Sequence, residues 1–208
     1  MLVSIANTKG GQGKTPWARE CAGYFEAELL DLNPENGDAY AWAQLANHPT
    51  RLVYEVDLAQ VLQEAAASKA FYVADCPPWD GPETRMALAF SSAVMVPVSP
   101  SPQGLRGLGR MEDLLKEARE QVNPNLKAGI VGTGKRHGVS FNAGWEQALA
   151  EAHRPKEGTH FLGLMPQRQA FLDSFATGGF TFLGSDPEAG EVRVILDKFA
   201  SLFKHKKH

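Results

Sequence analysis

The sequence predicts an α/β domain with a doubly wound, mostly parallel sheet flanked by helices. Short apolar runs alternate with helical segments of about 10 to 15 residues, which is the pattern of βαβ units. A glycine-rich stretch and two aspartates each follow one of these apolar runs, and ligands in such sheets bind at the carboxyl ends of the strands. A chain of 208 residues is also long enough to bury one core of this kind.

The first strand and helix follow directly from the start of the chain. Residues 2–6 form an apolar run that predicts a short buried strand. The stretch KTPWARECAGYF, residues 14–25, predicts a helix. Pro16 is tolerated in its first turn, because the N–H that proline lacks has no helical partner there. The next stretch, AELLDLNP, predicts a strand that ends at Asp31.

The alternation continues to the end of the chain. Leu58, Val61, Leu62 and Ala65 recur at helical spacing and predict a helix over 58–68. Further strands are expected over 51–56, 70–75, 93–99, 126–133 and 160–166. Further helices are expected over 38–47, 83–92, 104–121 and 140–152, and two more end the chain near Phe203.

No internal repeat, low-complexity linker or shift in composition divides the sequence. We therefore expect one domain over residues 1–203 and a short, disordered basic tail over 204–208. The last helix, 190–203, has an apolar face that suits either packing on the sheet or contact with a membrane surface, and we favour packing. The four tryptophans, Trp17, Trp42, Trp79 and Trp145, are expected to be packing residues.

The composition is that of an ordinary globular protein, with 43% hydrophobic and 22% charged residues. No apolar run approaches the roughly 20 residues of a membrane span, and the glycine-rich loop begins too early for a signal peptide. We therefore expect a cytoplasmic protein. The net charge of -3 excludes a uniformly basic nucleic-acid binder, so any DNA affinity needs a local patch. Cys21 and Cys76 are expected to be buried, reduced thiols.

The stretch NTKGGQGKTPW, residues 7–17, has the composition of a phosphate-binding loop. Its glycines allow backbone N–H groups to converge on one point, and the helix that follows adds its positive end. Lys14 is placed to reach the β- and γ-phosphates of a nucleotide, and the Thr15 hydroxyl to ligate Mg²⁺. A second lysine, Lys9, stands before the first glycine, where an ordinary phosphate loop does not need one.

The motif KGGQGKT resembles the deviant Walker A motif of the ParA/MinD family of ATPases. The resemblance implies a P-loop NTPase fold, with ATP and Mg²⁺ as cofactors and an ATP-dependent homodimer. In that family the early lysine, here Lys9, reaches across a nucleotide-sandwich dimer to the phosphates held by the partner subunit. One lysine then serves the chain's own nucleotide and the other serves its neighbour's, in the manner of an arginine finger.

The resemblance covers nearly the whole chain. LLDLNPENGDAYAWA is similar to the family's switch I, FYVADCPP to its Walker B and switch II stretch, and LMPQRQ to the late segment near the base. The implied nucleotide contacts are Gly10, Gly11, Gln12, Gly13, Lys14, Thr15, Pro16, Pro166, Gln167 and Arg168. The implied magnesium residues are Thr15 and Asp75, the latter through water. The implied catalytic residues are Lys9, Lys14, Asp31 and Asn33.

Three features depart from the family pattern. Switch I carries Asn33 where the family has a second aspartate, and an amide is a much poorer base, so hydrolysis is expected to be slow unless Glu35 or Asp38 substitutes. The interval from Lys14 to Asp31 is shorter than usual, which must shorten the first helix. Pro16 and Trp17 replace the usual threonine pair.

Small plasmid-partition ATPases of the ParF kind are the members that the chain resembles most. The resemblance implies non-specific DNA binding by the ATP-bound dimer and a centromere-binding partner of the ParB or ParG kind. The basic residues that are candidates for DNA contact are Arg106, Arg110, Lys116, Arg119, Lys127 and 135–137. Two alternatives stay open: a membrane-associated regulator of the MinD type, and a nucleotide-gated scaffold that hardly hydrolyses ATP.

Overall fold

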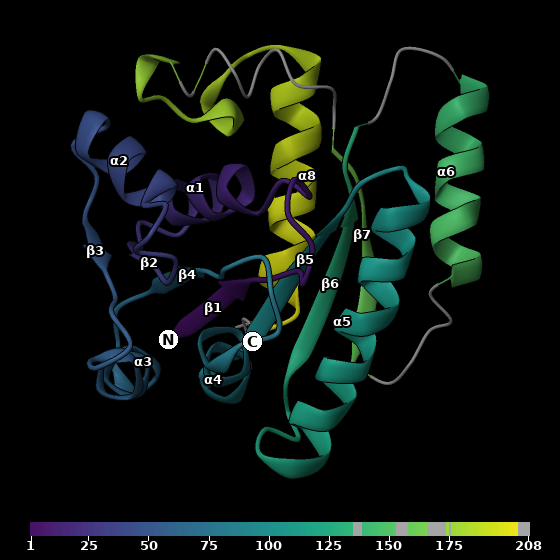
Figure 1. The fold of residues 1–208 in the computed structure, drawn as a ribbon. Coiled ribbons are helices and arrows are strands. Elements are labelled where there is room, and N and C mark those ends of the chain that lie inside the picture. The colour runs from purple at the N-terminus through teal and green to yellow at the C-terminus, as the bar shows by residue number, and fades with distance from the viewer. Residues whose placement is uncertain (135–138, 153–157, 166–173, 175, 204–208) are drawn as a thin grey trace, which may run out of the picture.

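A single seven-stranded sheet organises the protein (Figure 1). The structure, a computed structural model, describes residues 1–134, 139–152, 158–165, 174 and 176–203. The strands are β1 (Leu2–Ile5), β2 (Glu28–Asp31), β3 (Thr50–Leu52), β4 (Tyr72–Asp75), β5 (Ala93–Val98), β6 (Lys127–Gly132) and β7 (Thr159–Leu164). Their order is β3-β2-β4-β1-β5-β6-β7, and every described pairing is parallel. The predicted doubly wound sheet is confirmed, and it is parallel throughout these pairings rather than mostly so.

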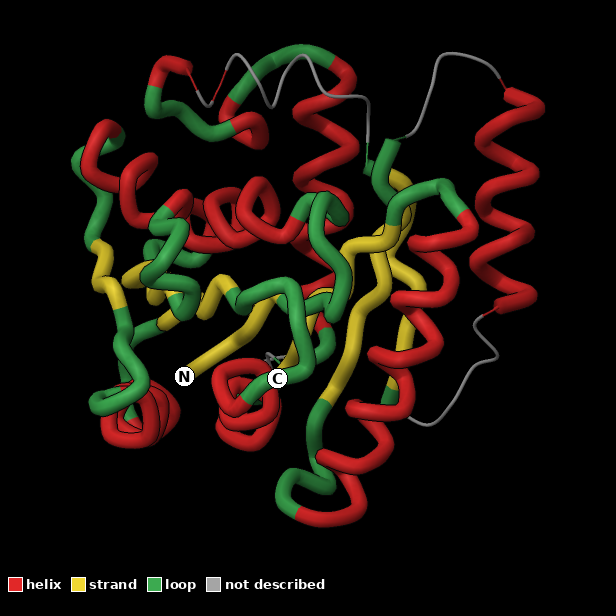
Figure 2. The backbone as a smooth tube through the Cα atoms, in the orientation of Figure 1, coloured by secondary structure: helices red, strands yellow, loops and turns green. Residues whose placement is uncertain are grey.

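Helices cover both faces of the sheet, as the tube in Figure 2 also shows. They are α1 (Lys14–Tyr24), α2 (Asp38–Leu45), α3 (Leu58–Ala67), α4 (Pro82–Phe90), α5 (Pro102–Gln121), α6 (Val139–Ala152), the 3-10 turn η1 (Thr181–Leu183) and α8 (Pro187–Ser201). One buried cluster joins the sheet to α3, α4, α5 and α6, and the other joins it to α1, α2 and α8. In β1, β2, β4 and β5 successive residues enter the two clusters in turn, because successive side chains of a strand point to opposite faces.

The direction of the chain through the sheet reverses between its two central strands, β1 and β4. After β1 the chain moves outward to β2 and β3, whereas after β4 it crosses to β5 and continues to β7. The helices after the two strands, α1 and α4, lie on opposite faces. The loops after β1 and β4 therefore flank a crevice at the carboxyl edge of the sheet, which is where ligands bind in open parallel sheets.

The predicted strand over 51–56 is too long. Leu52 lies opposite Asp31, the last residue of β2, and the Val53 N–H makes the final hydrogen bond to the Asp31 carbonyl at 3.0 Å. Beyond that point β2 has turned away, so an edge strand has no neighbour to pair with. Residues 55–57 form a turn instead, and Val56 is exposed.

The C-terminal helix α8 is packed into the core. Val192, Ile195, Leu196 and Phe199 are buried in the cluster that also holds α1 and α2, which confirms the packing interpretation of its apolar face. The first of the two predicted final helices falls largely outside the described residues. Within the described ranges, no helix combines the length and apolar character that crossing a bilayer requires.

Candidate phosphate-binding site

The loop between β1 and α1 has the backbone of an anion cradle. Gly11 and Gly13 have φ of 72° and 91°, a left-handed conformation that side chains other than glycine adopt with strain. Gly13 is the N-cap residue of α1, and no side chain caps this end of the helix. The first N–H groups of α1 therefore stay available for an anion, to which the helix also presents its positive end.

Two buried amide side chains tie this loop to the end of β5. The Asn7 Nδ2 donates to the Pro97 carbonyl at 2.8 Å, and the Asn7 Oδ1 accepts from the Lys9 N–H at 3.0 Å. The Gln12 Oε1 accepts from the Ser99 N–H at 2.8 Å, and its Nε2 lies 3.3 Å from the Gly10 carbonyl. The Gln12 side chain is thus used for support, which leaves its backbone N–H for the nucleotide contact predicted from the sequence.

The two lysines of the loop lie in different environments. Lys14 is 8% exposed, and its Nζ donates to the Lys9 carbonyl at 3.4 Å. Burial lowers the pKa of the Lys14 ammonium, while the nearby Asp75 acts in the opposite direction. Lys9 itself is exposed. A buried ammonium favours an anion beside it, because the anion offsets the cost of removing the charge from water.

Thr15 and Asp75 meet across the crevice between β1 and β4. The Thr15 hydroxyl donates to the Asp75 Oδ2 at 2.6 Å. The Asp75 Oδ1 is buried and has no hydrogen-bond partner among the described residues. Burial raises the pKa of Asp75 to about 7, opposed by the Thr15 hydrogen bond and reinforced by Asp31. The Thr15 hydroxyl and the Asp75 carboxylate, one of whose oxygens has no hydrogen bond among the described residues, fit Mg²⁺ or its bound water, because this ion prefers oxygen ligands.

Asp31 ends β2 and lies opposite Asp75 in the sheet register. Its Oδ1 accepts from the Asn33 N–H and its Oδ2 from the Tyr40 N–H, both at 3.0 Å. Burial raises the pKa of Asp31 in spite of these bonds. The carboxylate therefore holds the segment corresponding to switch I against the sheet, a role that the sequence did not indicate, and its part in catalysis stays a prediction.

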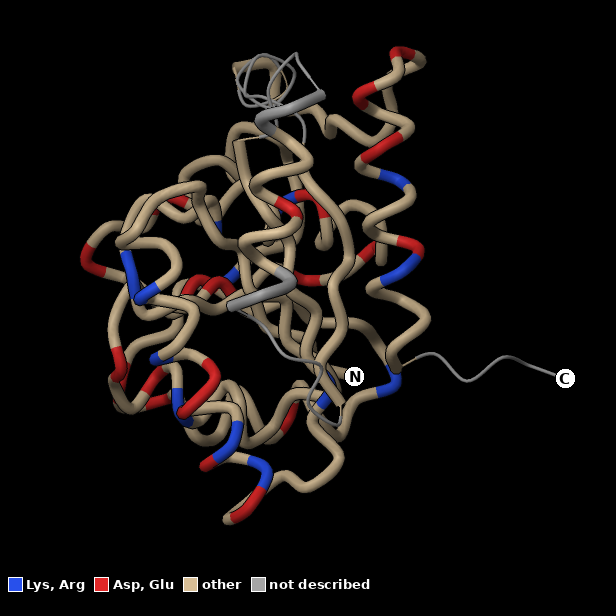
Figure 3. Tube along the Cα trace, turned by 90° about the vertical axis from the view of Figure 1, so that its right-hand side faces the viewer, with Lys and Arg blue, Asp and Glu red and all other residues tan. Residues whose placement is uncertain are grey.

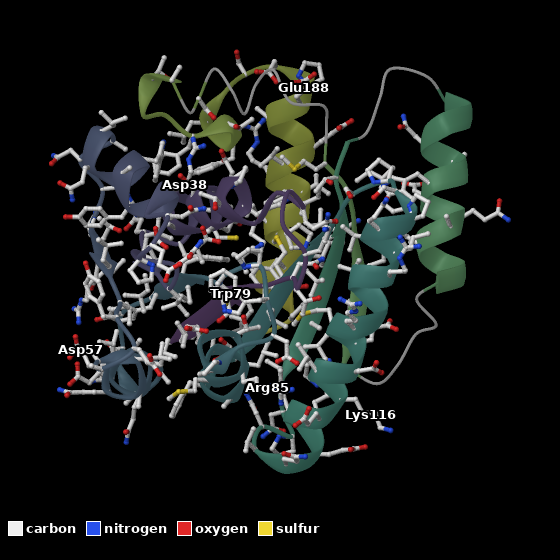
Figure 4. The ribbon with its side chains drawn as sticks, in the orientation of Figure 1. Asp38, Asp57, Trp79, Arg85, Lys116 and Glu188 are labelled. Carbon is white, nitrogen blue, oxygen red and sulfur yellow. The ribbon has the colours of Figure 1, made fainter. Side chains whose placement is uncertain are left out.

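Asn33 lies in a turn directly after β2. Its carbonyl accepts from the N–H groups of Asn36 and Gly37 at 3.0 Å and 2.9 Å. Glu35 and Asp38, the predicted substitutes for an aspartate at this position, are exposed. Of these two, Asp38 acts on the buried site, because its charge contributes to the raised pKa of Asp75 (Figure 4).

The remaining predicted contacts divide into two groups. Pro16 is the third residue of α1, where the missing N–H costs no helical hydrogen bond. Pro166, Gln167 and Arg168, predicted near the base, lie outside the described residues. Among the predicted site residues, the structure places the loop, Thr15, Asp31 and Asp75 next to one another.

Trp79 departs from the packing role expected of the tryptophans. It is 41% exposed on the loop after β4, whereas Trp17, Trp42 and Trp145 are buried. The Trp79 Nε1 donates to the Glu83 Oε2 at 3.3 Å, and a Cβ added to Gly10 would lie 3.9 Å from the Pro78 side chain. Figure 4 labels Trp79 between the carboxyl edge and α4. An exposed aromatic ring therefore follows Pro78, the residue that borders Gly10 of the phosphate-binding loop.

Basic residues are interspersed with acidic ones along the chain trace in Figure 3. Arg106 and Arg110 are exposed on α5, and Lys116 pairs with Glu120 at 3.8 Å. Arg119 is used internally, since its guanidinium donates to the Leu126 and Gly158 carbonyls and to the Thr159 hydroxyl. Arg119 is thus removed from the candidates for DNA contact, and residues 135–137 lie outside the described ranges.

A cavity of about 620 Å³ lies at the opposite edge of the sheet. Ser92 and Lys127, at the amino ends of β5 and β6, line it together with the end of α8. None of the described residues predicted to contact nucleotide or magnesium lines this cavity. Its volume therefore gives no support to the phosphate site, which rests on the loop geometry and the polar contacts.

Two known proteins are similar to this chain in sequence. No protein-family model matches the chain. It is 25% identical over 174 residues to the chromosome partitioning protein ParA of Myxococcus xanthus, covering 61% of this chain and 62% of that protein. It is 27% identical over 162 residues to the chromosome-partitioning ATPase Soj of Thermus thermophilus, covering 60% of this chain and 65% of that protein. The match thus spans less than two thirds of either relative.

Solved structures share the fold over nearly the whole chain. Apo McdA of Cyanothece superposes with a TM-score of 0.75 at 14% identity, covering 94% of this chain and 98% of that one. A putative plasmid partition protein of Borrelia burgdorferi bound to AMPPNP gives 0.70 at 15% identity, with coverage of 96% and 98%. The cell division protein MinD of Aquifex aeolicus gives 0.68 at 14% identity, with coverage of 96% and 97%.

Proposed function

Because the resemblance to the ParA/MinD family is confirmed in both sequence and fold, we propose that this chain is a partition ATPase of the ParA kind. It binds Mg-ATP and forms a nucleotide-sandwich dimer. The observation that carries the proposal is the contrast between the two loop lysines. Lys14 is buried against the loop, while Lys9, whose carbonyl it contacts, keeps an exposed side chain.

Each residue of the site has a role in this proposal. The backbone N–H groups of the loop and the start of α1 hold the phosphates, and the buried Lys14 neutralises them. Thr15 and Asp75 hold Mg²⁺, which when bound supplies charge neutralisation for phosphoryl transfer. The Thr15 oxygen would ligate the ion through a lone pair while its proton stays hydrogen-bonded to Asp75. Pro166, Gln167 and Arg168 contact the base.

Hydrolysis in this proposal depends on the segment after β2. Asp31 fixes that segment through the Asn33 and Tyr40 N–H groups. Asn33 can orient a water molecule but carries no charge to accept its proton, so turnover is slow without a partner. The nucleotide-gated scaffold remains the second candidate, and Asn33 is the observation that favours it. The buried apolar face of α8 offers no such support for a MinD-like membrane function.

The cellular task follows from the relatives. The two sequence relatives are named as chromosome-partitioning proteins and one structural neighbour as a plasmid partition protein. On this basis the ATP-bound dimer binds DNA without sequence preference, and a centromere-binding partner of the ParB or ParG kind stimulates release. Arg106 and Arg110, exposed on α5, are the described candidates for phosphate contact, and such binding weakens with salt.

The test is the mass of the protein in solution with each nucleotide, measured by size-exclusion chromatography with light scattering. Wild type is expected to be monomeric with ADP and dimeric with Mg-ATP. Lys9→Ala is expected to stay monomeric with both while still binding ATP. Lys116→Ala, which also removes an exposed lysine, is the matched control and should dimerise as wild type does.

Two results would contradict the proposal: a monomer at saturating Mg-ATP, or equal dimerisation with ADP and ATP. Phosphate release from the same samples separates the two candidate functions. An ATP-specific dimer that releases phosphate, faster with DNA and partner, is a partition ATPase. An ATP-specific dimer that releases none is a scaffold.

A further inference from the structure

We propose that Asn7 and Gly107 are positioning residues for Lys9. They fix where its backbone lies, and so determine which point beyond the chain's own site its ammonium can reach. This inference rests on the proposed function, since it concerns the lysine that acts across the dimer. Neither residue belongs to the KGGQGKT motif: Asn7 lies two residues before it, and Gly107 lies on α5.

Asn7 holds the Lys9 backbone from one side. Its side chain is fully buried at the end of β1, between the phosphate loop and β5. The amide nitrogen donates to Pro97 and the amide oxygen accepts from the Lys9 N–H, at 2.8 Å and 3.0 Å. Both the nitrogen and the oxygen of one rigid amide are therefore used, and the first residue of the KGGQGKT motif is linked to β5.

Gly107 gives Lys9 room from the other side. It is buried on α5, and a Cβ added there would lie 3.1 Å from the Asn7 Oδ1 and 3.2 Å from the Lys9 Cβ. Both distances are shorter than ordinary van der Waals contact. The first turns of α5 thus lie directly against the pair formed by Asn7 and Lys9, and a Cβ at position 107 would push one of the two away by a few tenths of an ångström.

The backbone conformation does not explain this glycine. Gly107 is absent from the residues with positive φ, so alanine fits its helical conformation. Glycine within a helix costs about 0.5 to 1 kcal/mol relative to alanine. Gly109, two residues along the same helix, shows the contrast, because a Cβ there would meet nothing within 4 Å. The close approach to Lys9 is therefore what distinguishes position 107.

The consequence is a division between the two lysines. The position of Lys14 is determined by α1 and the glycines of the loop. The position of Lys9 is determined by β5 and α5, through Asn7 and Gly107. Displacing Lys9 by a few tenths of an ångström should therefore weaken the ATP-bound dimer without weakening binding of a nucleotide to the monomer. A purely structural role for Gly107 would not separate these two measurements.

The experiment compares Gly107→Ala with Gly109→Ala. Three quantities are measured for each: the dissociation constant of the Mg-ATP dimer, the affinity of the monomer for Mg-ADP, and the midpoint of thermal unfolding. Since misplacement by 1 Å can cost about a hundredfold, Gly107→Ala is expected to weaken the dimer roughly tenfold. Its ADP affinity should stay within about twofold of wild type, and Gly109→Ala should match wild type in the dimer and in ADP binding.

A second pair keeps the test decisive if Gly107→Ala folds poorly. Asn7→Ser and Asn7→Ala both lose the bond to Pro97, but serine keeps an oxygen that can accept from the N–H two residues on. The dimer of Asn7→Ser is therefore expected to be tighter than that of Asn7→Ala. Equal dimer affinities in this pair would overturn the role of Asn7.

The outcomes distinguish the two proposals. If wild type dimerises with Mg-ATP in a Lys9-dependent way but Gly107→Ala dimerises equally well, the positioning inference is wrong and the proposed function stands. Parallel loss of dimerisation and ADP affinity in Gly107→Ala also overturns the inference, because it indicates general damage to the loop. If wild type does not dimerise with Mg-ATP, both proposals fail.

Discussion

Asp75 is stabilised on one side only. Its Oδ2 accepts from Thr15, while its Oδ1 is buried with no partner in the described part of the chain. Lys14 attracts the carboxylate, yet burial dominates and raises the pKa to about 7. An ionised carboxylate in such a position destabilises the metal-free fold, and a bound cation would relieve that cost.

The pH dependence of the metal-free protein follows from this shift. The pKa of Asp75 is about 7 in the fold, against an ordinary value of 3.8 for an aspartate in water. Between these values the folded state binds the extra proton, so the free energy of unfolding falls as pH rises towards 7, by at most about 4 kcal/mol. Urea unfolding with a chelator from pH 5 to 8 should show this fall. Asp75→Asn should flatten it, and equal slopes for both proteins would contradict the assignment.

The sequence predicted the residues of the site that depend on local spacing. Lys14 and Thr15 follow the glycines directly, and Asp75 ends an apolar strand, so their places could be inferred from the chain order. Asn7, Gly107 and the support role of Gln12 were missed. Their partners come from a segment about 90 residues away, and their contacts depend on how β5 and α5 pack beside β1.

At the scale of elements, α1 links the phosphate loop to two other parts of the fold through buried charges. The Glu20 carboxylate accepts from the Thr181 and Phe182 N–H groups at 2.9 Å and 3.1 Å. The Arg19 guanidinium lies over the Trp42 ring of α2, 4.4 Å from its centroid. Two adjacent charged residues in WARECAG were the available sequence signal for these contacts. The helix that follows the phosphate loop is thus in direct contact with both α2 and η1.

The fit of α1 against η1 can be tested at Gly23. A Cβ at this position would lie 2.3 Å from the Phe180 ring, so alanine must displace that ring. Gly23→Ala is expected to lower the free energy of unfolding by about 1 to 3 kcal/mol through overpacking, although alanine has the higher helix propensity. Urea unfolding measures the change, and Gly109→Ala is a control with open space. A Gly23→Ala protein as stable as wild type would show that the ring moves freely.

The alternation of apolar runs with helical segments predicted which helices and strands exist. Capping residues and prolines mark where several of them begin or end. Ser101 caps α5 by accepting from the Gly104 N–H at 2.9 Å, and Pro102 opens the helix, so it begins two residues before the predicted start. The end of β3 could not be predicted in this way. It is set by where β2 stops, because Tyr54 and Val56 favour a strand but have nothing to pair with.

At the scale of the whole molecule, the carboxyl edge of the sheet is also an outer surface. The loop after β4 is fastened to α4, since the Thr84 hydroxyl donates to the Trp79 carbonyl at 2.9 Å. Arg85 then joins Asp80 to Glu117 of α5, with bonds of 2.6 Å and 2.8 Å (Figure 4). These exposed ion pairs add little stability. They do connect the loop beside Gly10 to the helix that carries Arg106 and Arg110.

Trp79 offers a readout of what happens at this surface. Its ring is 41% exposed, and the other three tryptophans are at most 6% exposed. If the proposed dimer forms over this edge, Mg-ATP should reduce acrylamide quenching of Trp79 fluorescence, and ADP should not. Trp79→Phe should remove the quenchable signal, and Lys9→Ala should retain it with no response to ATP. An equal response to both nucleotides would place the dimer surface elsewhere.

The central position of β1 has a consequence for how the protein is made. Its neighbours in the sheet are β4 and β5, so β1 has no partner until Asp75 has been synthesised and lacks its second partner until Val98 has been synthesised. At ribosomal rates of about 5 to 20 residues per second, that wait lasts roughly 5 to 20 s. The glycine loop waits with it, because its supports at Pro97, Ser99 and Gly107 are also made late. Nucleotide therefore cannot assist the earliest folding of the nascent chain, because a chain that ends before Pro97 lacks these supports of the loop.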